Sequence, residues 1–382
     1  MINFNKNTSK RRKGTISTLH GELKFPAFLP DATYGTISNL SYEDLEKTGT
    51  KALVTNTLHL EQKIGSENLR TYGGFHKFVN WLNPVLSDSG GFQVFSLIYR
   101  NQDSGNKITD AGCSFKDYSN GNYLFLSPEN SQQIQANIGS DIRVVLDEPL
   151  FGDSDLKSIK RSVDRTTVWA KRAKQQFLEI NNLSEADFNN PKIKRPLLVS
   201  VIQGANNFEQ RKRSLEELVE IGFDIYGLGG LPIQTQRTWD YTHKGGFYKE
   251  LLHFLAEIIP QDKLRYALGV GNPDNLAYAT SVGWDIFDTV LPSRNARHGY
   301  IYVSKGQGDE EFETYSVIHL KNTKYEFDKT PLDENCSCQT CKTTSREYLR
   351  YLLRIGEGSG YRLATIHNLH FFSKFMEKLQ LL

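Results

Sequence analysis

The chain contains the segment Leu197-Leu198-Val199-Ser200-Val201-Ile202-Gln203-Gly204, a nearly continuous apolar run that ends in an amide and a glycine. Runs of this length and composition are typical of parallel strands that are buried on both faces. Seven further runs of the same kind begin at Pro26, Ala52, Val85, Ile142, Ile225, Tyr266 and Ile286. The sequence therefore predicts eight buried strands.

Helical patterns lie between many of these runs. Apolar residues recur at helical spacing over 159–180 and over 208–221. A third pattern, over 127–138, opens with Ser127 and Pro128, which suit the cap and the first position of a helix. Strands that alternate with helices predict a (βα)8 TIM barrel. The alternative, a doubly wound open sheet, would need a Gly-x-Gly-x-x-Gly turn after the first strand, which is missing here.

The bulk composition indicates a folded protein rather than a disordered one. The chain has 382 residues, of which 38% are hydrophobic and 24% charged. It has no run of about 18 apolar residues, so we expect no transmembrane helix. The first residues lack the apolar core of a signal peptide, which together with the cysteine usage predicts a reducing, cytoplasmic location. A net charge of +2 neither requires nor excludes a nucleic-acid partner.

Three of the four cysteines fall within six residues: Cys336, Cys338 and Cys341. His367 follows downstream, and three thiolates with one imidazole complete a tetrahedral zinc shell. Such a closed shell leaves no position for a catalytic water, so we expect one structural Zn²⁺ per subunit. The alternative is one local disulfide with a spare thiol. We predict a barrel over 1–304, and a zinc-binding subdomain with closing helices, one of them over 345–355, over 305–382.

Polar residues and glycines follow the apolar runs, at the positions where a barrel enzyme places its chemistry. They are Asn56, Asp88, Asp147, Gln203, Gly229-Gly230, Gly269-x-Gly271 and Asp288. Any one of the aspartates can be a helix cap, but three that converge on one face predict an active site. Two carboxylates at one mouth suit glycosidic chemistry, and an aspartate can accept two hydrogen bonds from one edge of guanine.

At these residues the chain resembles the tRNA-guanine transglycosylase family over almost its whole length. The matching motifs are Asp88-Ser89-Gly90-Gly91-Phe92-Gln93, Tyr226-Gly227-Leu228-Gly229-Gly230-Leu231, Gly269-Val270-Gly271-Asn272-Pro273-Asp274, the segment from Phe287 to Arg297, and the Cys3His set. The family has a TIM barrel with a zinc subdomain. It exchanges the wobble guanine, position 34 of tRNAs with a GUN anticodon, for a 7-deazaguanine on the queuosine route.

The resemblance implies a role for each matching residue. Asp288 is the expected nucleophile, which forms a covalent aspartyl–tRNA intermediate, and Asp88 the general acid/base. The implied substrate-binding set is Ser89, Gly90, Gly91, Phe92, which stacks on the base, and Asp147, Gln203, Gly230 and Leu231, which read it. The implied RNA-binding set is Gly269, Val270, Gly271, Asn272, Pro273, Asp274, Asn275, Ser293, Arg294, Asn295, Ala296 and Arg297. The implied zinc ligands are Cys336, Cys338, Cys341 and His367.

The implied partners are guanine and 7-deazaguanine bases, and the anticodon loops of the Asp, Asn, His and Tyr acceptor tRNAs. A second copy of the chain is also expected, as a homodimer, and no membrane. Some residues depart from the common bacterial pattern: Pro149 replaces a cysteine, Thr235 a glutamate, and Asp31 ends the first strand where that pattern has no aspartate. The incoming base therefore stays open among preQ1, queuine and preQ0. Two alternatives to a tRNA enzyme also stay open, a non-catalytic RNA-binding subunit and an enzyme that exchanges bases in DNA.

Overall fold

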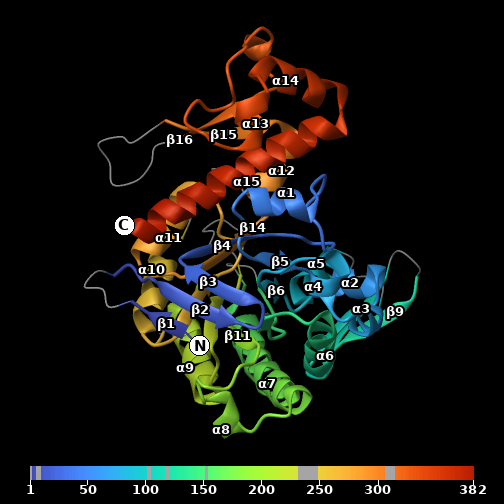
Figure 1. The fold of residues 1–382 in the computed structure, drawn as a ribbon. Coiled ribbons are helices and arrows are strands. Elements are labelled where there is room, and N and C mark those ends of the chain that lie inside the picture. The colour runs from blue at the N-terminus through green and yellow to red at the C-terminus, as the bar shows by residue number, and fades with distance from the viewer. Residues whose placement is uncertain are drawn as a thin grey trace.

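Eight parallel strands form a barrel in the computed structural model (Figure 1), which describes residues 2–5, 10–100, 105–117, 121–150, 154–230, 248–305 and 315–382, without the side chains of 99 and 100. The strands are β4 (Ala27–Pro30), β5 (Leu53–Thr55), β6 (Val85–Ser87), β10 (Ile142–Val144), β11 (Leu197–Ile202), β12 (Ile225–Leu228), β13 (Leu264–Ala267) and β14 (Ile286–Thr289). Each pairs with the next in sequence, and β14 returns to β4. A parallel bridge between Asp31 and Val54 joins β4 to β5. The predicted TIM-like barrel is confirmed.

Helices connect the strands and cover the outside of the barrel. They are α1 (Tyr42–Lys47), α2 (Thr57–Lys63), α3 (Ser66–Tyr72), α4 (Phe75–Val79), α5 (Gly91–Arg100), α6 (Pro128–Ile138), α7 (Leu156–Asn181), α8 (Glu185–Phe188), α9 (Phe208–Ile221), α10 (Lys249–Ile258), α11 (Pro273–Ser281) and α12 (Leu291–His298). The three helices predicted between the strands are confirmed as α6, α7 and α9. Ser127 caps α6 by accepting a hydrogen bond from the Asn130 N–H, and Pro128 is its first residue, as the sequence indicates.

The interior of the barrel is filled by every second residue of the strands. One buried cluster takes side chains from all eight strands, among them Leu29, Val54, Leu86, Val201 and Ile286. Successive side chains of a strand point to opposite faces, so a residue two positions further on faces the interior again, nearer the mouth. Those next residues are Asp31, Asn56, Asp88, Gln203 and Asp288. The alternation that builds the apolar core therefore also collects polar groups at the carboxyl-terminal mouth.

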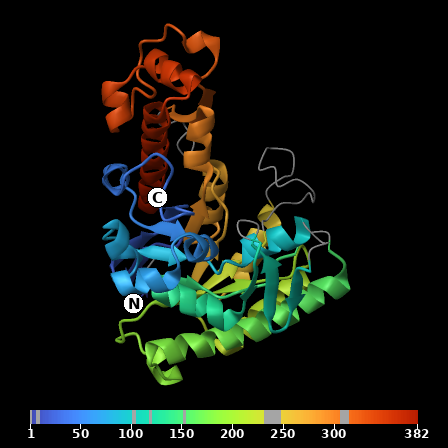
Figure 2. The same cartoon turned by 90° about the vertical axis from the view of Figure 1, so that its right-hand side faces the viewer.

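A three-stranded antiparallel sheet closes the other end of the barrel. It consists of β1 (Ile2–Phe4), β2 (Gly14–Thr18) and β3 (Gly21–Phe25). Ile16, Leu23 and Phe25 of this sheet belong to the interior cluster. A second small sheet, of β7 (Lys107–Thr109), β8 (Gly112–Lys116) and β9 (Tyr123–Leu126), lies between α5 and α6 in the chain, to one side of the barrel (Figure 2). The sheet of β1, β2 and β3 therefore covers the amino-terminal end of the barrel, and the carboxyl-terminal mouth is the end where a site can lie.

Asp141 fastens the β2–β3 turn to this closed end. Its fully buried carboxylate accepts hydrogen bonds from the Val85 N–H at 2.9 Å and the His20 N–H at 2.9 Å. The stacked rings of His20 and His76 also contact it, at 3.0 and 3.2 Å. Burial alone would raise the pKa of Asp141, but the hydrogen bonds from His76 and Val85 hold it below its usual value. The ionised form is therefore the one that the fold uses.

We expect Asp141→Asn to lower the free energy of unfolding by about 2 kcal/mol, because the asparagine amide turns a donor toward groups that already donate. Urea unfolding at pH 7, followed by circular dichroism, measures the change. The matched control is Asp262→Asn, at an exposed aspartate before β13, which should shift the free energy by less than about 0.5 kcal/mol. Equal stability of the two variants would contradict this role for Asp141.

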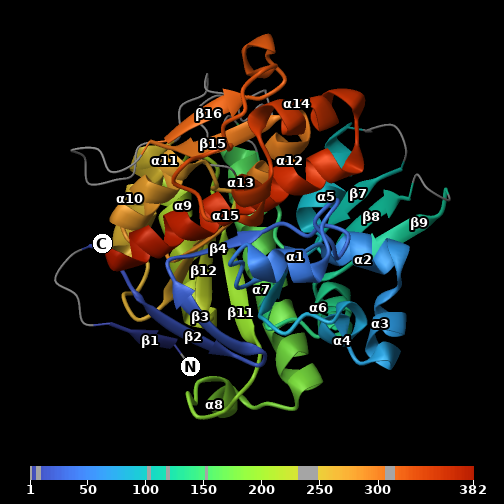
Figure 3. The same ribbon diagram turned by 45° about the horizontal axis from the view of Figure 1, so that its top comes forward.

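The C-terminal part stands on the barrel and is tied to it by one long helix. It comprises β15 (Tyr300–Ser304), β16 (Tyr315–His319), η1 (Thr323–Tyr325), α13 (Gln339–Thr343), α14 (Arg346–Ile355) and α15 (Gly358–Leu381). The predicted helix over 345–355 is confirmed as α14, which Ser345 caps. Figure 3 shows β15 and β16 on one side of α15, with β4 and α1 on the other. The division at residue 304 stays a prediction; the paired strands β15 and β16 lie across it.

Helix α15 contributes to three separate cores, one of which takes Ile366 and Leu369 together with residues of α2 and α6. Ala364 belongs to a cluster with Leu320, Leu332 and residues of α14, whereas Phe372, four residues before Met376, packs on the outer helices of the barrel. None of the helices in the described ranges has the length and apolar composition that are needed to cross a membrane.

Candidate active site and zinc centre

Asp88 lies just after β6 and is held by donors on both carboxylate oxygens. Its Oδ1 accepts from the N–H groups of Thr57 at 2.9 Å and Gly90 at 3.0 Å. Its Oδ2 accepts from Asn56 Nδ2 at 2.5 Å and Gln93 Nε2 at 3.3 Å. Gly90 has φ of +76°, a conformation that glycine adopts without strain, and this turn brings its N–H back to the carboxylate. The side chain is therefore fixed in orientation at the mouth.

Asp288 is the last residue but one of strand β14, and its carboxylate is held on one oxygen. Tyr266 donates its hydroxyl to Oδ1 at 2.7 Å, and the Gly269 N–H donates to the same oxygen at 2.9 Å. Gly269 has φ of +72°, and this backbone turn after β13 aims its N–H at the carboxylate. Within the described ranges no other residue donates a hydrogen bond to Oδ2, which leaves this oxygen available at the mouth.

Asp147 and Gln203 form a polar pair just beyond the ends of the neighbouring strands β10 and β11. Gln203 Nε2 donates to Asp147 Oδ2 at 2.6 Å, and Gln203 is fully buried. Gln203 Oε1 is also buried and has no hydrogen-bond partner among the described residues. A buried carbonyl oxygen without a partner is costly unless a ligand supplies the donor. The pair therefore offers acceptors for the N–H groups of a flat heterocycle.

The glycines after β12 are fitted to this pair. A Cβ at Gly229 would meet Gln203 Nε2 at 2.3 Å and Val201 Cγ1 at 2.5 Å, so a side chain there would displace Gln203. Gly230, with φ of +72°, lies beside Arg211, whose buried guanidinium donates to the Ala205 and Ile202 carbonyls. Leu231, Ile233 and Thr235 follow directly, outside the described residues.

Burial raises the pKa of the carboxyl groups at the mouth. The pKa of Asp88 rises to about 6, chiefly through burial, and the charge of Asp288 adds to the shift. The pKa of Asp147 rises to about 7, again mainly through burial, against the hydrogen bond from Gln203. Burial also raises the pKa of Asp288, although the bonds from Gly269 and Tyr266 oppose it. Carboxyl groups that titrate near neutrality are suited to proton transfer, and such groups cluster at functional sites.

The remaining residues of the Asp88 motif serve the turn into α5. The Ser89 hydroxyl accepts from the Gly91 N–H at 3.2 Å, and its carbonyl accepts from Ser131. A Cβ at Gly91 would meet Leu146 at 2.8 Å, so the helix begins close against the barrel. Phe92 is 43% exposed in the first turn of α5, where an aromatic ring can stack on a base. Ser89, Gly90 and Gly91 thus position Asp88 and Phe92.

The segment after β13 combines buried packing with an exposed helix start. A Cβ at Gly271 would lie 1.9 Å from Thr289 Cγ2, so glycine is needed where this turn crosses the end of β14. Asn272 caps α11 through a hydrogen bond from the Asp274 N–H, and Pro273 is the first residue of the helix. Val270 is buried, whereas Asp274 is exposed and Asn275 half-buried. Only part of the predicted RNA-binding segment therefore faces solvent.

Helix α12 begins three residues after Asp288 and carries two neighbouring cations. Arg294 is exposed, and burial together with the charge of Arg294 lowers the pKa of Arg297. Neither guanidinium forms an ion pair within the part of the chain that the structure describes. In contrast, Ser293 donates to the Val290 carbonyl, Asn295 donates to the Tyr302 hydroxyl, and Ala296 is buried. The two arginines are the members of this set that can meet phosphates.

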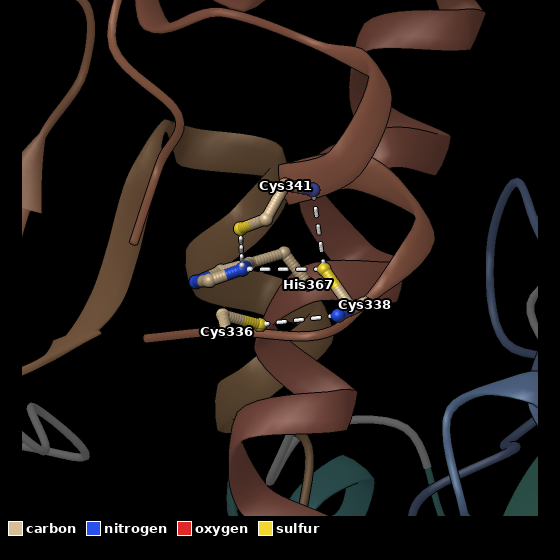
Figure 4. Close-up of side chains that lie close together, drawn as sticks. All are labelled: Cys336, Cys338, Cys341 and His367. Carbon is tan, nitrogen blue, oxygen red and sulfur yellow. Dashed lines mark hydrogen bonds between the residues drawn. The ribbon is translucent and has the colours of Figure 1, made fainter. Parts of the chain in front are cut away.

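Cys336, Cys338, Cys341 and His367 gather at one point, with all four ligand atoms within 4.8 Å of one another. Figure 4 shows the three thiols around the imidazole. The Sγ atoms of Cys338 and Cys341 lie 3.6 and 3.2 Å from His367 Nδ1. Bonds of about 2.3 Å to sulfur and 2.0 Å to nitrogen separate two tetrahedral ligands by about 3.6 Å, which fits this cluster.

The surroundings of the cluster also fit a metal. His367 is fully buried, and its Nε2 lies 2.7 Å from the Tyr302 carbonyl, an acceptor. That contact keeps the proton on Nε2 and leaves Nδ1 free to bind a metal. The N–H groups of Cys338 and Cys341 donate to the sulfurs of Cys336 and Cys338. All four cysteines are free thiols, so the disulfide alternative is not what the structure shows.

The sequence did not identify the residues that hold the carboxylates in place. Tyr266 was expected only as a strand residue, and Asn56 only as a polar strand end. Their positions follow from pairing between strands that are distant in sequence, which a single sequence does not contain. The interior alternation on β13, from Leu264 to Tyr266, is the signal that would have placed Tyr266 below the mouth.

A parallel barrel with two carboxylates at its mouth defines a class, the TIM-barrel enzymes. Within it, the family model described as queuine tRNA-ribosyltransferase matches residues 7–381. The protein named queuine tRNA-ribosyltransferase from Blochmanniella floridana is 38% identical over 370 residues, 97% of this chain and 89% of its own. That from Hamiltonella defensa is 38% identical over 375 residues (98% and 92%), and that from Staphylococcus aureus strain bovine RF122 / ET3-1 is 40% identical over 372 (97% and 89%).

The chain therefore belongs to the queuine tRNA-ribosyltransferase family, the tRNA-guanine transglycosylases. This confirms the family predicted from the sequence motifs. It also confirms the prediction of a transferase that takes part in queuosine modification of tRNA.

Proposed function

We propose that this protein exchanges the guanine at position 34 of tRNAs with a GUN anticodon for a 7-deazaguanine, preQ1 or queuine, through a covalent aspartyl–tRNA intermediate. The observation that carries the proposal is the placement of Asp88 and Asp288 at one barrel mouth, beside the Asp147–Gln203 pair. Family membership supplies the reaction, and this arrangement supplies the groups that the reaction needs.

Asp288 acts as the nucleophile. Tyr266 and Gly269 hold Oδ1, so Oδ2 is the oxygen that attacks C1′ of the guanosine. The C1′–O bond forms as the C1′–N9 bond breaks, and the guanine leaves with the bonding electron pair. The N–H and O–H donors on Oδ1 oppose the rise in pKa that burial causes, and they orient the carboxylate toward the sugar.

Asp88 moves the proton. With a pKa of about 6, it can protonate the departing base and then accept the N9 proton of the incoming 7-deazaguanine. The incoming N9 attacks C1′, and Asp288 leaves as a carboxylate. Two inversions at C1′ restore the original configuration, and the ester conserves the free energy of the glycosidic bond, so no nucleotide cofactor is required.

Asp147, Gln203 and Gly230 read the base, and Phe92 stacks on it. The unpaired Gln203 Oε1 and the Asp147 carboxylate accept from the N–H groups of the guanine edge. Guanine must leave the loop to enter this pocket, which an unpaired anticodon base does at low cost. The family motif assigns recognition of the 7-substituent, and with it the choice among preQ1, queuine and preQ0, to the segment that contains Leu231 and Thr235.

The tRNA contacts are assigned to the barrel mouth and to the zinc-bearing part, which is the C-terminal part that contains the Cys3His cluster. Arg294 and Arg297 would meet phosphates of the anticodon loop, together with the exposed residues of 269–275. One Zn²⁺ would be held by Cys336, Cys338, Cys341 and His367. The bound ion would connect α13 to α15. We include the Asp, Asn, His and Tyr acceptor tRNAs as substrates and a homodimer as the assembly.

The second candidate, a non-catalytic RNA-binding subunit, has no use for two fixed carboxylates. In this chain four donors are aimed at Asp88 and two at Asp288, an arrangement that a binding surface does not need. We therefore favour the catalytic function.

The test is exchange of radiolabelled guanine into tRNA with a GUN anticodon, with the same tRNA carrying adenosine at position 34 as the control. We expect label to enter the first tRNA only, and preQ1 or queuine, added in turn, to displace it. Incorporation that is equal in both tRNAs, or absent from both, would overturn the proposal. A protein–RNA adduct that survives denaturation would exclude the subunit alternative.

A further inference from the structure

A third carboxylate, Asp31, stands at the mouth without a role in this mechanism. It follows β4, and Ala27 and Leu29 of that strand belong to the interior cluster. Asp31 is two positions beyond Leu29 and its backbone pairs with Val54, so it continues the interior face at the mouth. Strand β14 pairs with β4 so that Asp288 lies opposite Leu29. Asp31 is therefore one step nearer the opening than the nucleophile, on the adjacent strand.

The charges at the mouth agree with this placement. Burial is the main reason that the pKa of Asp31 rises to about 7, and the charges of Asp288 and Asp88 both add to it. The pKa of the buried Tyr266 hydroxyl is raised by burial and by the charges of the same three carboxylates. The Thr33 hydroxyl donates to Asp31 Oδ1 at 2.9 Å and orients the group. Asp31 therefore shares the mouth with Asp88 and Asp288.

Asp31 is not placed to read the base. The base-reading residues follow β10, β11 and β12, whereas β4 lies four strands from β11 in either direction around the barrel. The base must lie on the far side of the mouth from β4, with its sugar between the base and β14. Asp31 therefore faces the sugar rather than the heterocycle.

The chemistry of the sugar specifies what Asp31 would meet. A nucleophile that displaces the base attacks C1′ from the face opposite the base, and the 2′-hydroxyl of ribose is on that attacked face. The 3′ oxygen is esterified within a polynucleotide, so the 2′-hydroxyl is the free donor nearest to Asp288. A carboxylate is acceptor-rich, and a hydrogen bond from a hydroxyl to it is charge-assisted.

We propose that Asp31 accepts a hydrogen bond from the 2′-hydroxyl of the nucleotide that is exchanged, and that it thereby selects RNA over DNA. This inference rests on the proposed function, because it takes Asp288 as the nucleophile. It makes Asp31 a specificity residue that contacts the sugar.

The experiment compares two anticodon stem–loops that differ only in having guanosine or 2′-deoxyguanosine at the exchanged position. The kcat/KM of labelled-guanine exchange is measured for the wild-type protein, Asp31→Ala and Asp31→Asn, and the dissociation constant of each stem–loop is measured by fluorescence anisotropy. We expect the wild type to prefer the ribose substrate by roughly 10-fold or more. Asp31→Ala should bring this ratio close to one, because its kcat/KM should fall for the ribose substrate and stay nearly unchanged for the deoxyribose substrate. Asp31→Asn should keep part of it, since its amide oxygen still accepts.

An unchanged ribose-to-deoxyribose ratio in Asp31→Ala would overturn the inference. If exchange of both substrates also falls by the same factor in both variants, Asp31 serves proton transfer instead. If the wild type exchanges no guanine, the proposed function fails, but the ratio of the two dissociation constants still reports whether Asp31 reads the 2′-hydroxyl. Melting temperatures identify a variant that does not fold, and Asp31→Asn, which keeps the shape of the side chain, then decides the question.

Discussion

Asp288→Asn is expected to lower guanine exchange by at least about 10³-fold, because the amide has no anionic oxygen with which to attack C1′. The Tyr266 hydroxyl and the Gly269 N–H can still donate to the asparagine Oδ1, so the side chain should keep its orientation. Binding of tRNA should change by no more than a few fold, since the substitution removes no contact to phosphate. Exchange kinetics, a binding isotherm and a denaturing gel for the covalent adduct measure the three effects.

The same variant should be at least as stable as the wild-type protein. Burial raises the pKa of Asp288 above its ordinary value of 3.8, so ionising this group costs more in the folded than in the unfolded chain. Wild-type stability therefore falls as the pH rises from about 4 through the raised pKa, and asparagine, which does not ionise, escapes this loss. The gain in melting temperature of Asp288→Asn should appear over that interval and stay constant above it.

Asp262→Asn, the same replacement at an exposed site, should leave both exchange and melting temperature unchanged. Residual exchange in Asp288→Asn within 10-fold of the wild type would exclude Asp288 as nucleophile. Loss of activity together with a lower melting temperature would instead mean that Asp288 is a structural residue. An inactive but more stable variant is expected when a buried ionisable group serves catalysis at a cost to stability.

The barrel could be predicted from the sequence because its strands are buried on both faces. Segments such as Leu197–Ile202 and Ile286–Thr289 are uniformly buried apart from the half-buried Asp288, so each is visible as a short apolar run. The same pattern fixed the strand ends, and with them Asp88, Gln203 and Asp288. The local chemistry of a helix start was equally clear at Ser127.

The contacts within the site could not be predicted in this way. Gly269 was expected to touch RNA, but its N–H donates to Asp288, a residue 19 positions away that only the pairing of β13 with β14 brings near. Gly271 was placed in the same set, although its most evident requirement is the close approach of Thr289. The Gln203–Asp147 pair spans 56 positions. Motifs name the residues of a site, but the partners of each come from strand register.

The position of Asp31 relative to the other carboxylates could not be predicted from the sequence either. As a residue after Pro30 it was only a departure from the family pattern. Its relation to Asp288 and Asp88 depends on closure of the barrel, in which the first strand meets the last. Closure is a property of the whole chain, so no local pattern carries it.

Removal of zinc is expected to unfold the C-terminal part of the protein. The ligands Cys336, Cys338 and Cys341 surround the start of α13, and His367 lies in the middle of α15. A metal bound by all four would join these elements, and structural zinc contributes on the order of 10 kcal/mol to folding. Chelation should lower the melting temperature by more than 10 °C, as an effect of several kcal/mol does in a chain of this size, and should expose 315–382 to protease. A reductant alone should have no effect.

His367→Gln should reproduce the effect of chelation and abolish stoichiometric zinc, measured by elemental analysis. His370→Gln is the matched control, because His370 lies one turn further along α15 and its Nε2 contacts the Ser337 hydroxyl rather than a sulfur. Cys113→Ser is the second control: this buried thiol belongs to β8, so its replacement should leave one zinc per chain. Full zinc content in His367→Gln would show that the imidazole is not a ligand.

Loss of zinc should weaken tRNA binding more than it slows the chemical step. Asp288 is held by Tyr266 and Gly269 of the barrel, and neither belongs to the zinc-bearing part. Arg294 and Arg297, in contrast, are on α12, which packs against α15 and β15. If α15 loosens, these cations move while the carboxylates stay. Single-turnover exchange at saturating tRNA should therefore persist in the chelated protein at low temperature, although the dissociation constant for tRNA should rise. If the metal took part in the reaction, its removal would instead abolish exchange even at saturating tRNA.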